Sequence, residues 1–202
     1  IWGPRDESPL GDGSRLRDSQ CGLFATGKVL RRFRCKFTYL PMCRLEDQEF
    51  YEGIRRFLAT VNIIKELKDL TILQIATRPS GFWTMMVNEA EVKDEMDAVE
   101  QNKKDEVIQV IDYLKKETII EISDEALVKV AALKVAIKSI AKRYNCKAAA
   151  VQCWNAMQGV LGIFPCAANA LLTDEKFPVA CETDIHGAIT SIIAQAASIE
   201  DN

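Results

Sequence analysis

Two carboxylates stand two residues apart where a short apolar run ends. The run from Phe177 to Cys181 is typical of a buried parallel strand, and Glu182 and Asp184 follow it. If the strand continues, both carboxylates point to the same side. Gly187 then opens a stretch of helical spacing, and open α/β sheets bind ligands beyond such strand ends. The alternative is an ordinary strand–helix turn in which one acid caps the helix.

The elements that must position these acids alternate along the chain. We predict strands at residues 34–40, 70–76, 148–153 and from 177 onward, and helices at 21–33, 47–68, 82–91, 107–116 and 123–144. Strands alternating with helices of this length indicate an α/β fold with a parallel sheet and right-handed crossovers. Ser123 is a favourable helix N-cap, with acids following it in the first turn.

Two stretches need a separate interpretation. The helix at 47–68 is predicted to be amphipathic, because its apolar residues recur at steps of 4, 3, 4 and 3: Phe50, Ile54, Phe57, Val61 and Ile64. Residues 93–104 are dense in charge, so we expect a solvated face without a functional role. The alternation of strands and helices predicts a strand after residue 91. Because none is evident, either the sheet lacks that strand or a segment of the chain is missing there.

Composition excludes several classes of partner. The chain has 202 residues, a net charge of -3 and 48% hydrophobic residues, as in a soluble globular protein. Basic residues do not cluster with aromatics over a long span, so we expect no nucleic-acid partner. No apolar run approaches the roughly 20 residues of a membrane helix, so we expect no membrane partner. Glycine-rich phosphate loops are absent as well, which disfavours a nucleotide or flavodoxin-like domain.

The seven cysteines form an odd set without a CxxC pair. Cys153 and Cys181 lie in apolar runs, where a free cysteine packs as a small hydrophobic residue. We expect reduced thiols and therefore a cytoplasmic protein. A zinc site or a redox pair is the alternative.

Several motifs together resemble the L-fucose isomerase family and its uncharacterised relatives. They are residues 180–188 (Ala-Cys-Glu-Thr-Asp-Ile-His-Gly-Ala), residues 151–154 (Val-Gln-Cys-Trp), residues 162–166 and residues 75–83. The resemblance spans nearly the whole chain and implies two Rossmann-like domains before a C-terminal domain. The resemblance assigns residues 1–40 to the tail of a preceding α/β domain, residues 41–176 to a Rossmann-like α/β domain and residues 177–202 to the start of the C-terminal domain. The chain is then part of a larger multidomain subunit with a parallel sheet flanked by helices.

The resemblance also implies an activity, the interconversion of aldoses and ketoses through an enediol on a divalent metal, Mn²⁺. Asp184 matches the aspartate that ligates the metal and takes part in proton transfer. The family's other catalytic acid falls at Asn169, an amide that cannot shuttle a proton, and Glu182 is a candidate replacement. His186 does not match the family's metal-binding histidine, which lies in the C-terminal domain, and fits the first turn of a helix better.

The remaining assignments concern the substrate and the assembly. Asn169, Trp154 and Arg78 are predicted to contact a carbohydrate, although Trp154 equally suits helix packing and Arg78 an exposed turn. Apolar surface left by incomplete domains predicts a homo-oligomer. The competing hypothesis is a sugar-binding or regulatory α/β module that lacks catalysis. The amide at residue 169 favours that hypothesis, and the Glu182-x-Asp184 pair favours the enzyme.

Overall fold

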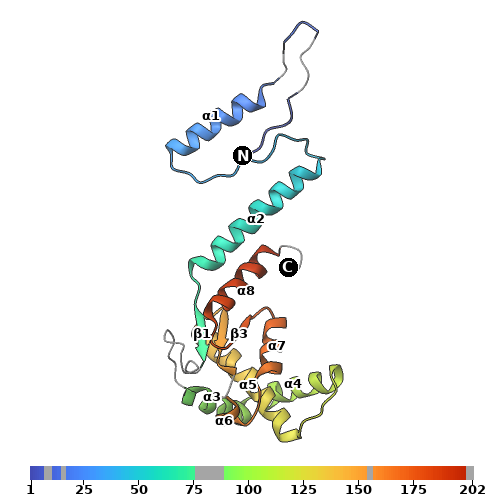
Figure 1. Ribbon diagram of the computed structural model, residues 1–202, viewed down its shortest axis with the longest axis vertical. Helices are drawn as coiled ribbons and strands as arrows, with labels where there is room; N and C mark the ends of the chain where they lie inside the picture. The colour runs from blue at the N-terminus through green and yellow to red at the C-terminus, as the bar shows by residue number, and fades with distance from the viewer. Residues whose placement is uncertain (7–10, 15–16, 76–88, 154–156, 199–202) are drawn as a thin grey trace. The chain divides into compact units, whose positions relative to one another are not determined.

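The computed structural model describes residues 1–6, 11–14, 17–75, 89–153 and 157–198. The chain divides into two compact units, Ile1–Lys65 with Ala196–Asn202, and Glu66–Gln195. The elements, labelled in Figure 1, are α1 Ser19–Arg32, α2 Gln48–Lys68, β1 Ile72–Ile75, α3 Glu89–Asn102, α4 Lys104–Glu117, α5 Asp124–Arg143, β2 Ala148–Val151, α6 Gln158–Leu161, α7 Cys166–Asp174, β3 Val179–Cys181 and α8 Ile185–Ala197. No described helix is long and apolar enough to cross a membrane.

The first unit confirms two predicted helices and corrects one predicted strand. Helix α1 begins after Asp18, whose carboxylate accepts a hydrogen bond from the Cys21 N–H at 3.1 Å. Residues 34–40 form no strand. Arg34 adopts a left-handed backbone (φ 55°), and the Leu40 N–H donates to the Ile1 carbonyl at 2.9 Å. The segment therefore has a strand-like composition but forms no hydrogen-bonded ladder with a neighbouring strand.

Helix α2 confirms the predicted helix, but its apolar stripe is not a buried face. No residue of α2 is buried, and Ile64 is 60% exposed. Periodicity therefore identified the helix correctly without identifying what covers it.

The second unit is built on a three-stranded parallel sheet in the order β1-β2-β3, which confirms the predicted α/β class. Ile72 pairs with Ala148 and Val151 pairs with Cys181. The central strand, Ala-Ala-Ala-Val, is completely buried. Small side chains there allow helices to pack closely on both faces of the sheet.

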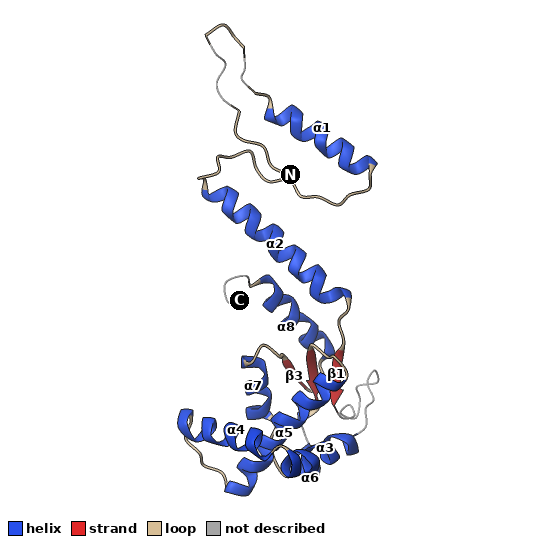
Figure 2. Cartoon of the chain, turned by 180° about the vertical axis from the view of Figure 1, so that it is seen from behind, coloured by secondary structure: helices blue, strands red, loops and turns tan. Residues whose placement is uncertain are grey.

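Helices flank the sheet on both sides (Figure 2). Ala188 and Ile192 of α8 pack against Ala148 and Ile72 on one face. The larger cluster is built from α3, α4, α5 and α7 together with strand residues such as Ile75 and Val151. Helix α5 lies at its centre, and its N-cap Ser123 accepts from the Ala126 N–H, as predicted.

The interpretation of residues 93–104 as a solvated face is wrong in part. Most of this stretch is helix α3, and Val92, Met96 and Val99 are buried in the core. Their steps of 4 and 3 form one apolar face, which the surrounding charges obscured. A helix thus stands where a strand was expected after residue 91. The helix predicted at 82–91 falls mostly outside the described residues.

Candidate functional site

The three strands end at one edge of the sheet. Parallel pairing places Ile75, Val151 and Cys181 side by side at their carboxyl ends. Two backbone hydrogen bonds extend this edge: the Gln152 N–H donates to Ile75 at 3.0 Å, and the Thr183 N–H donates to Val151 at 3.3 Å. Side chains that follow these strands therefore gather where α/β sheets bind ligands.

The predicted site residues are only partly visible at this edge. Arg78 and Trp154 lie outside the described residues, so their roles stay predictions. Glu182, Asp184 and Asn169 are described, and the structure brings Asn169 against Cys181, the residue that precedes Glu182.

The turn between β3 and α8 has an uncommon backbone. Glu182 and Thr183 both adopt left-handed conformations, with φ of 58° and 56°. The strand therefore ends at Cys181, and the premise that it continues through Asp184 is wrong. Thr183 is buried, and its hydroxyl donates to the Glu182 carbonyl at 2.6 Å. Such backbone strain costs roughly 1–3 kcal/mol per residue and often occurs at binding sites.

Asp184 caps helix α8. Its Oδ1 accepts from the Gly187 N–H at 2.9 Å, and its carbonyl accepts from the Ala188 N–H at 3.0 Å. A Cβ on Gly187 would lie 2.5 Å from Asp184 Oδ2, so this carboxylate needs the glycine beside it. His186 is exposed in the first turn of the same helix. Asp184 thus caps the helix, as the alternative interpretation of the acid pair predicted, and its role in metal binding stays a prediction.

Asn169 lies in the first turn of α7 and is 4% exposed. Its Nδ2 donates to Cys181 Sγ at 3.7 Å, whereas its Oδ1 is buried and has no hydrogen-bond partner among the described residues. Thr173 holds this helix to β3, because its hydroxyl donates to the Asn169 carbonyl at 2.9 Å and accepts from the Val179 N–H at 3.1 Å. The amide is therefore fixed beside the strand end.

Cys181, which this amide contacts, has two further thiols nearby, Cys153 and Cys166, a feature that sequence reasoning missed. Burial raises the pKa of Cys181, the Asn169 hydrogen bond lowers it, and the neighbouring Cys153 and Cys166 raise it further. The net shift is upward, so the Cys181 thiol is protonated at neutral pH. All seven cysteines are free, as predicted. The available signal was the placement of these cysteines at strand ends and at a helix start.

The donor atoms for a metal are incomplete within the described part of the chain. Carboxylates such as Glu182 and Asp184 suit a hard cation such as Mn²⁺. However, no group of three or more His, Cys, Asp or Glu residues there is arranged to hold a metal ion. These residues alone do not make a metal site.

Comparison with known proteins bears on these features. The family model described as "Fucose/sulfoquinovose isomerase, N-terminal domain" matches residues 1–68. A sulfoquinovose isomerase of Priestia aryabhattai is 28% identical over 208 residues, covering 96% of this chain. The chain is thus similar to sulfoquinovose isomerases along nearly its whole length, and its first 68 residues resemble the N-terminal domain of fucose and sulfoquinovose isomerases.

Other relatives show the same similarity and indicate how much of their length it covers. A sulfoquinovose isomerase of Priestia megaterium shows the same 28% identity, and one of Alkalicoccus urumqiensis is 25% identical over 98% of this chain. The chain spans about half the length of the curated relatives it matches, 46% of the Priestia proteins. The N-terminal domain match ends close to the division between the two structural units. The boundaries predicted at residues 40 and 176 stay predictions.

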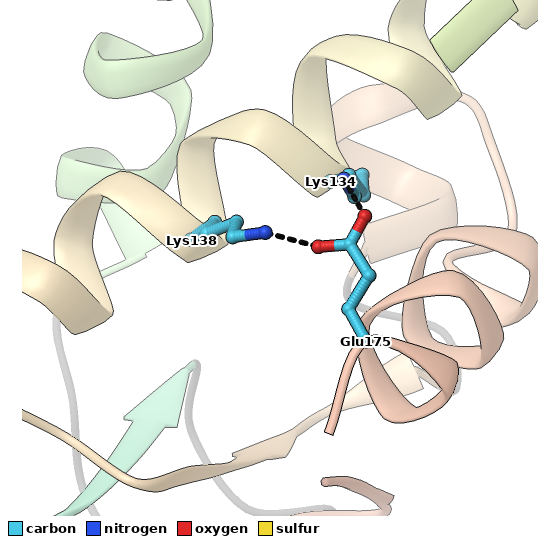
Figure 3. A network of polar contacts seen from close by, with 3 residues as sticks. All are labelled: Lys134, Lys138 and Glu175. Atoms are coloured by element: carbon cyan, nitrogen blue, oxygen red, sulfur yellow. Dashed lines mark hydrogen bonds and ion pairs between the residues drawn. The ribbon is translucent and has the colours of Figure 1, made fainter. Parts of the chain in front are cut away.

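One charged cluster away from the strand ends was not predicted (Figure 3). Glu175, at the end of α7, receives hydrogen bonds from Lys134 and Lys138 of α5. Burial opposes ionisation of Glu175, but both lysines outweigh it, so the pKa of Glu175 lies below its ordinary value. The lysines are four residues apart on one face of α5, and only the fold reveals their common partner.

Proposed function

We propose that the protein is a sugar isomerase that interconverts an aldose and a ketose through an enediol. The observation that carries this proposal is similarity to proteins named sulfoquinovose isomerase over 96% of the chain. Their name makes a sulfonated hexose the first substrate to test, with fucose and arabinose beside it. We also propose that the protein is cytoplasmic, with which its seven free cysteines are consistent. We further propose that it forms a homo-oligomer.

The acids after β3 supply the proposed chemistry. Glu182 is exposed and is the proposed base that removes the proton beside the sugar carbonyl. Asp184 is the proposed metal ligand, because one oxygen caps α8 and its second oxygen is not used by the cap. A bound Mn²⁺ would hold neighbouring sugar oxygens and stabilise the negative charge of the enediolate. The complete ligand set requires residues beyond those that the structure describes.

A non-catalytic sugar-binding module is the second candidate, and Asn169 favours it. This residue stands at the position assigned by resemblance to a catalytic acid, and its buried amide cannot transfer a proton. The module would keep the carbohydrate contacts at the strand ends without the turnover.

The test uses full-length protein and the substitution Asp184→Asn. Asparagine retains an oxygen that can cap α8, so the fold should survive while the charge is removed. We expect isomerisation to fall by about 100-fold or more and Mn²⁺ affinity to fall with it. Asp124→Asn, the same change at the start of α5, is the matched control and should leave both unchanged.

A second variant separates the roles of the two acids. Glu182→Gln should lower turnover more than Mn²⁺ affinity, as measured by isothermal titration calorimetry. The assay follows ketose formation from sulfoquinovose, fucose and arabinose with and without chelator. If none is isomerised but one of them raises the melting temperature, the binding-module candidate is correct.

A further inference from the structure

The first unit contains a strongly basic segment within an acidic chain. Residues 19–45 include six Lys or Arg and no Asp or Glu. Because the whole chain has a net charge of -3, the other residues sum to -9. Positive charge is therefore concentrated on α1 and the segment after it, which attracts anions locally despite the overall charge.

Three of these cations share one face of α1. Lys28, Arg31 and Arg32 are spaced i, i+3 and i+4, which makes them neighbours on a helix. All three are exposed, and none forms an ion pair within the described ranges of the chain. The helix dipole favours Arg31 and Arg32 in the last turn, whereas Lys28 repels both of them at i, i+3 and i, i+4, a repulsion that a bound anion would relieve.

These cations line an open hollow of about 670 Å³ together with Phe24, Gly27 and Tyr39. The Tyr39 hydroxyl lies 1.9 Å from the point where a Cβ of residue 27 would stand, so only glycine permits this contact. Two exposed aromatic side chains and three cations thus line one small concave surface. Its size matches that of small-molecule sites.

We propose that this hollow binds a small organic anion through a phosphate or sulfonate group. Arg31, Arg32 and Lys28 supply charge-assisted hydrogen bonds to the oxyanion. Phe24 and Tyr39 supply an apolar wall for the body of the ligand. The hollow is confined to one helix and one short segment, too small for an extended nucleic-acid surface. The proposal does not rest on the isomerase activity.

Calorimetry of the protein at low salt tests the charge. The probes are inorganic phosphate, methanesulfonate and phenyl phosphate, and phenyl phosphate should bind tightest because it also contacts the aromatic wall. The double variant Lys28→Gln/Arg31→Gln should bind phenyl phosphate about ten-fold or more weakly. Arg44→Gln removes a charge of the same segment outside the hollow and should change affinity less than about two-fold. An equal loss per charge in both variants would mean general attraction and overturn the proposal.

Gly27→Ala tests the shape without changing charge. Alanine suits a helix, so α1 should remain folded by circular dichroism, but the new Cβ must displace Tyr39. Phenyl phosphate should then lose its advantage over inorganic phosphate. Unchanged affinities would refute the site. Single-stranded RNA that binds more tightly than phenyl phosphate and displaces it would instead assign the surface to nucleic acid and overturn the small-ligand proposal.

Discussion

Helices α2 and α5 have similar length and similar apolar spacing, yet they differ in burial. Helix α2 has 21 residues, none of them buried, whereas α5 has 20 residues, of which eleven are buried. Sequence periodicity predicted both helices. The difference shows that periodicity determines which side chains share a helix face, whereas the neighbouring elements determine whether that face is buried.

The neighbours of α5 explain its burial. It packs against α3, α4 and α7, so even its nominally polar side receives a partner. Ala131, Ala132 and Ala136 are fully buried and permit these close approaches. Lys134 is 8% exposed and is tolerated there because Glu175 neutralises it.

The largest effect should come from truncating the same kind of side chain in both helices. Leu133→Ala in α5 removes a completely buried side chain and should cost about 2–5 kcal/mol of unfolding free energy. Ile64→Ala in α2, which is 60% exposed, should cost about 0.5 kcal/mol or less. Urea unfolding followed by circular dichroism gives both values. Equal costs would show that the stripe of α2 is covered in solution.

A middle-sized effect is expected at the ion cluster on α5. Glu175→Gln keeps the shape but leaves the Lys134 charge without its partner. Since Glu175 is 36% exposed, solvent reduces the cost to about 1–2 kcal/mol. Lys138→Gln, at a residue 56% exposed, is the control and should cost less. If Lys138→Gln lowers the free energy of unfolding as much as Glu175→Gln does, the unpartnered charge of buried Lys134 is not the reason for the loss.

The same cluster predicts a pH dependence with a definite sign. Because the folded pKa of Glu175 lies below its ordinary value of 4.5, its stabilising contribution is present above pH 4.5. That contribution is lost as the pH falls through the folded pKa. The stability difference between wild type and Glu175→Gln should therefore shrink in acid, as measured by urea unfolding from pH 7 to pH 3. A difference that grows in acid would contradict the assignment.

The smallest effect should come from the N-cap of α5. Ser123→Ala removes the acceptor for the Ala126 N–H and should cost about 1 kcal/mol. Ser123→Asp restores an acceptor and should recover most of that stability. Thermal melts of the two variants measure the difference, and identical melting temperatures would mean that water caps α5 equally well.

Local chemistry made much of the fold predictable. Ser123 and its following acids fixed the start of α5, and the apolar runs located β1, β2 and β3. The strand predicted at 34–40 failed because strand residues need a neighbouring strand, which sequence alone does not supply. The core face of α3 was missed because Val92, Met96 and Val99 are separated by charges.

The candidate site was predictable in position but not in geometry. The strand-end placement of Glu182 and Asp184 followed from the pattern, and Asp184 does stand at the start of α8. The left-handed turn could not be foreseen, because neither Glu nor Thr favours that backbone. Contacts between distant segments, such as Asn169 with Cys181, depend on how α7 packs beside β3.

The turn at Glu182 and Thr183 has a consequence for engineering heat tolerance. Glycine adopts positive φ without steric cost, so Glu182→Gly or Thr183→Gly relieves strain that the present residues maintain. Laboratory evolution that selects only for survival at high temperature would therefore tend to replace this pair, beside the sheet edge where ligands of such folds bind. Lineages that gain heat tolerance through Glu182→Gly would lose the Glu182 carboxylate and with it any role that this group has in the site.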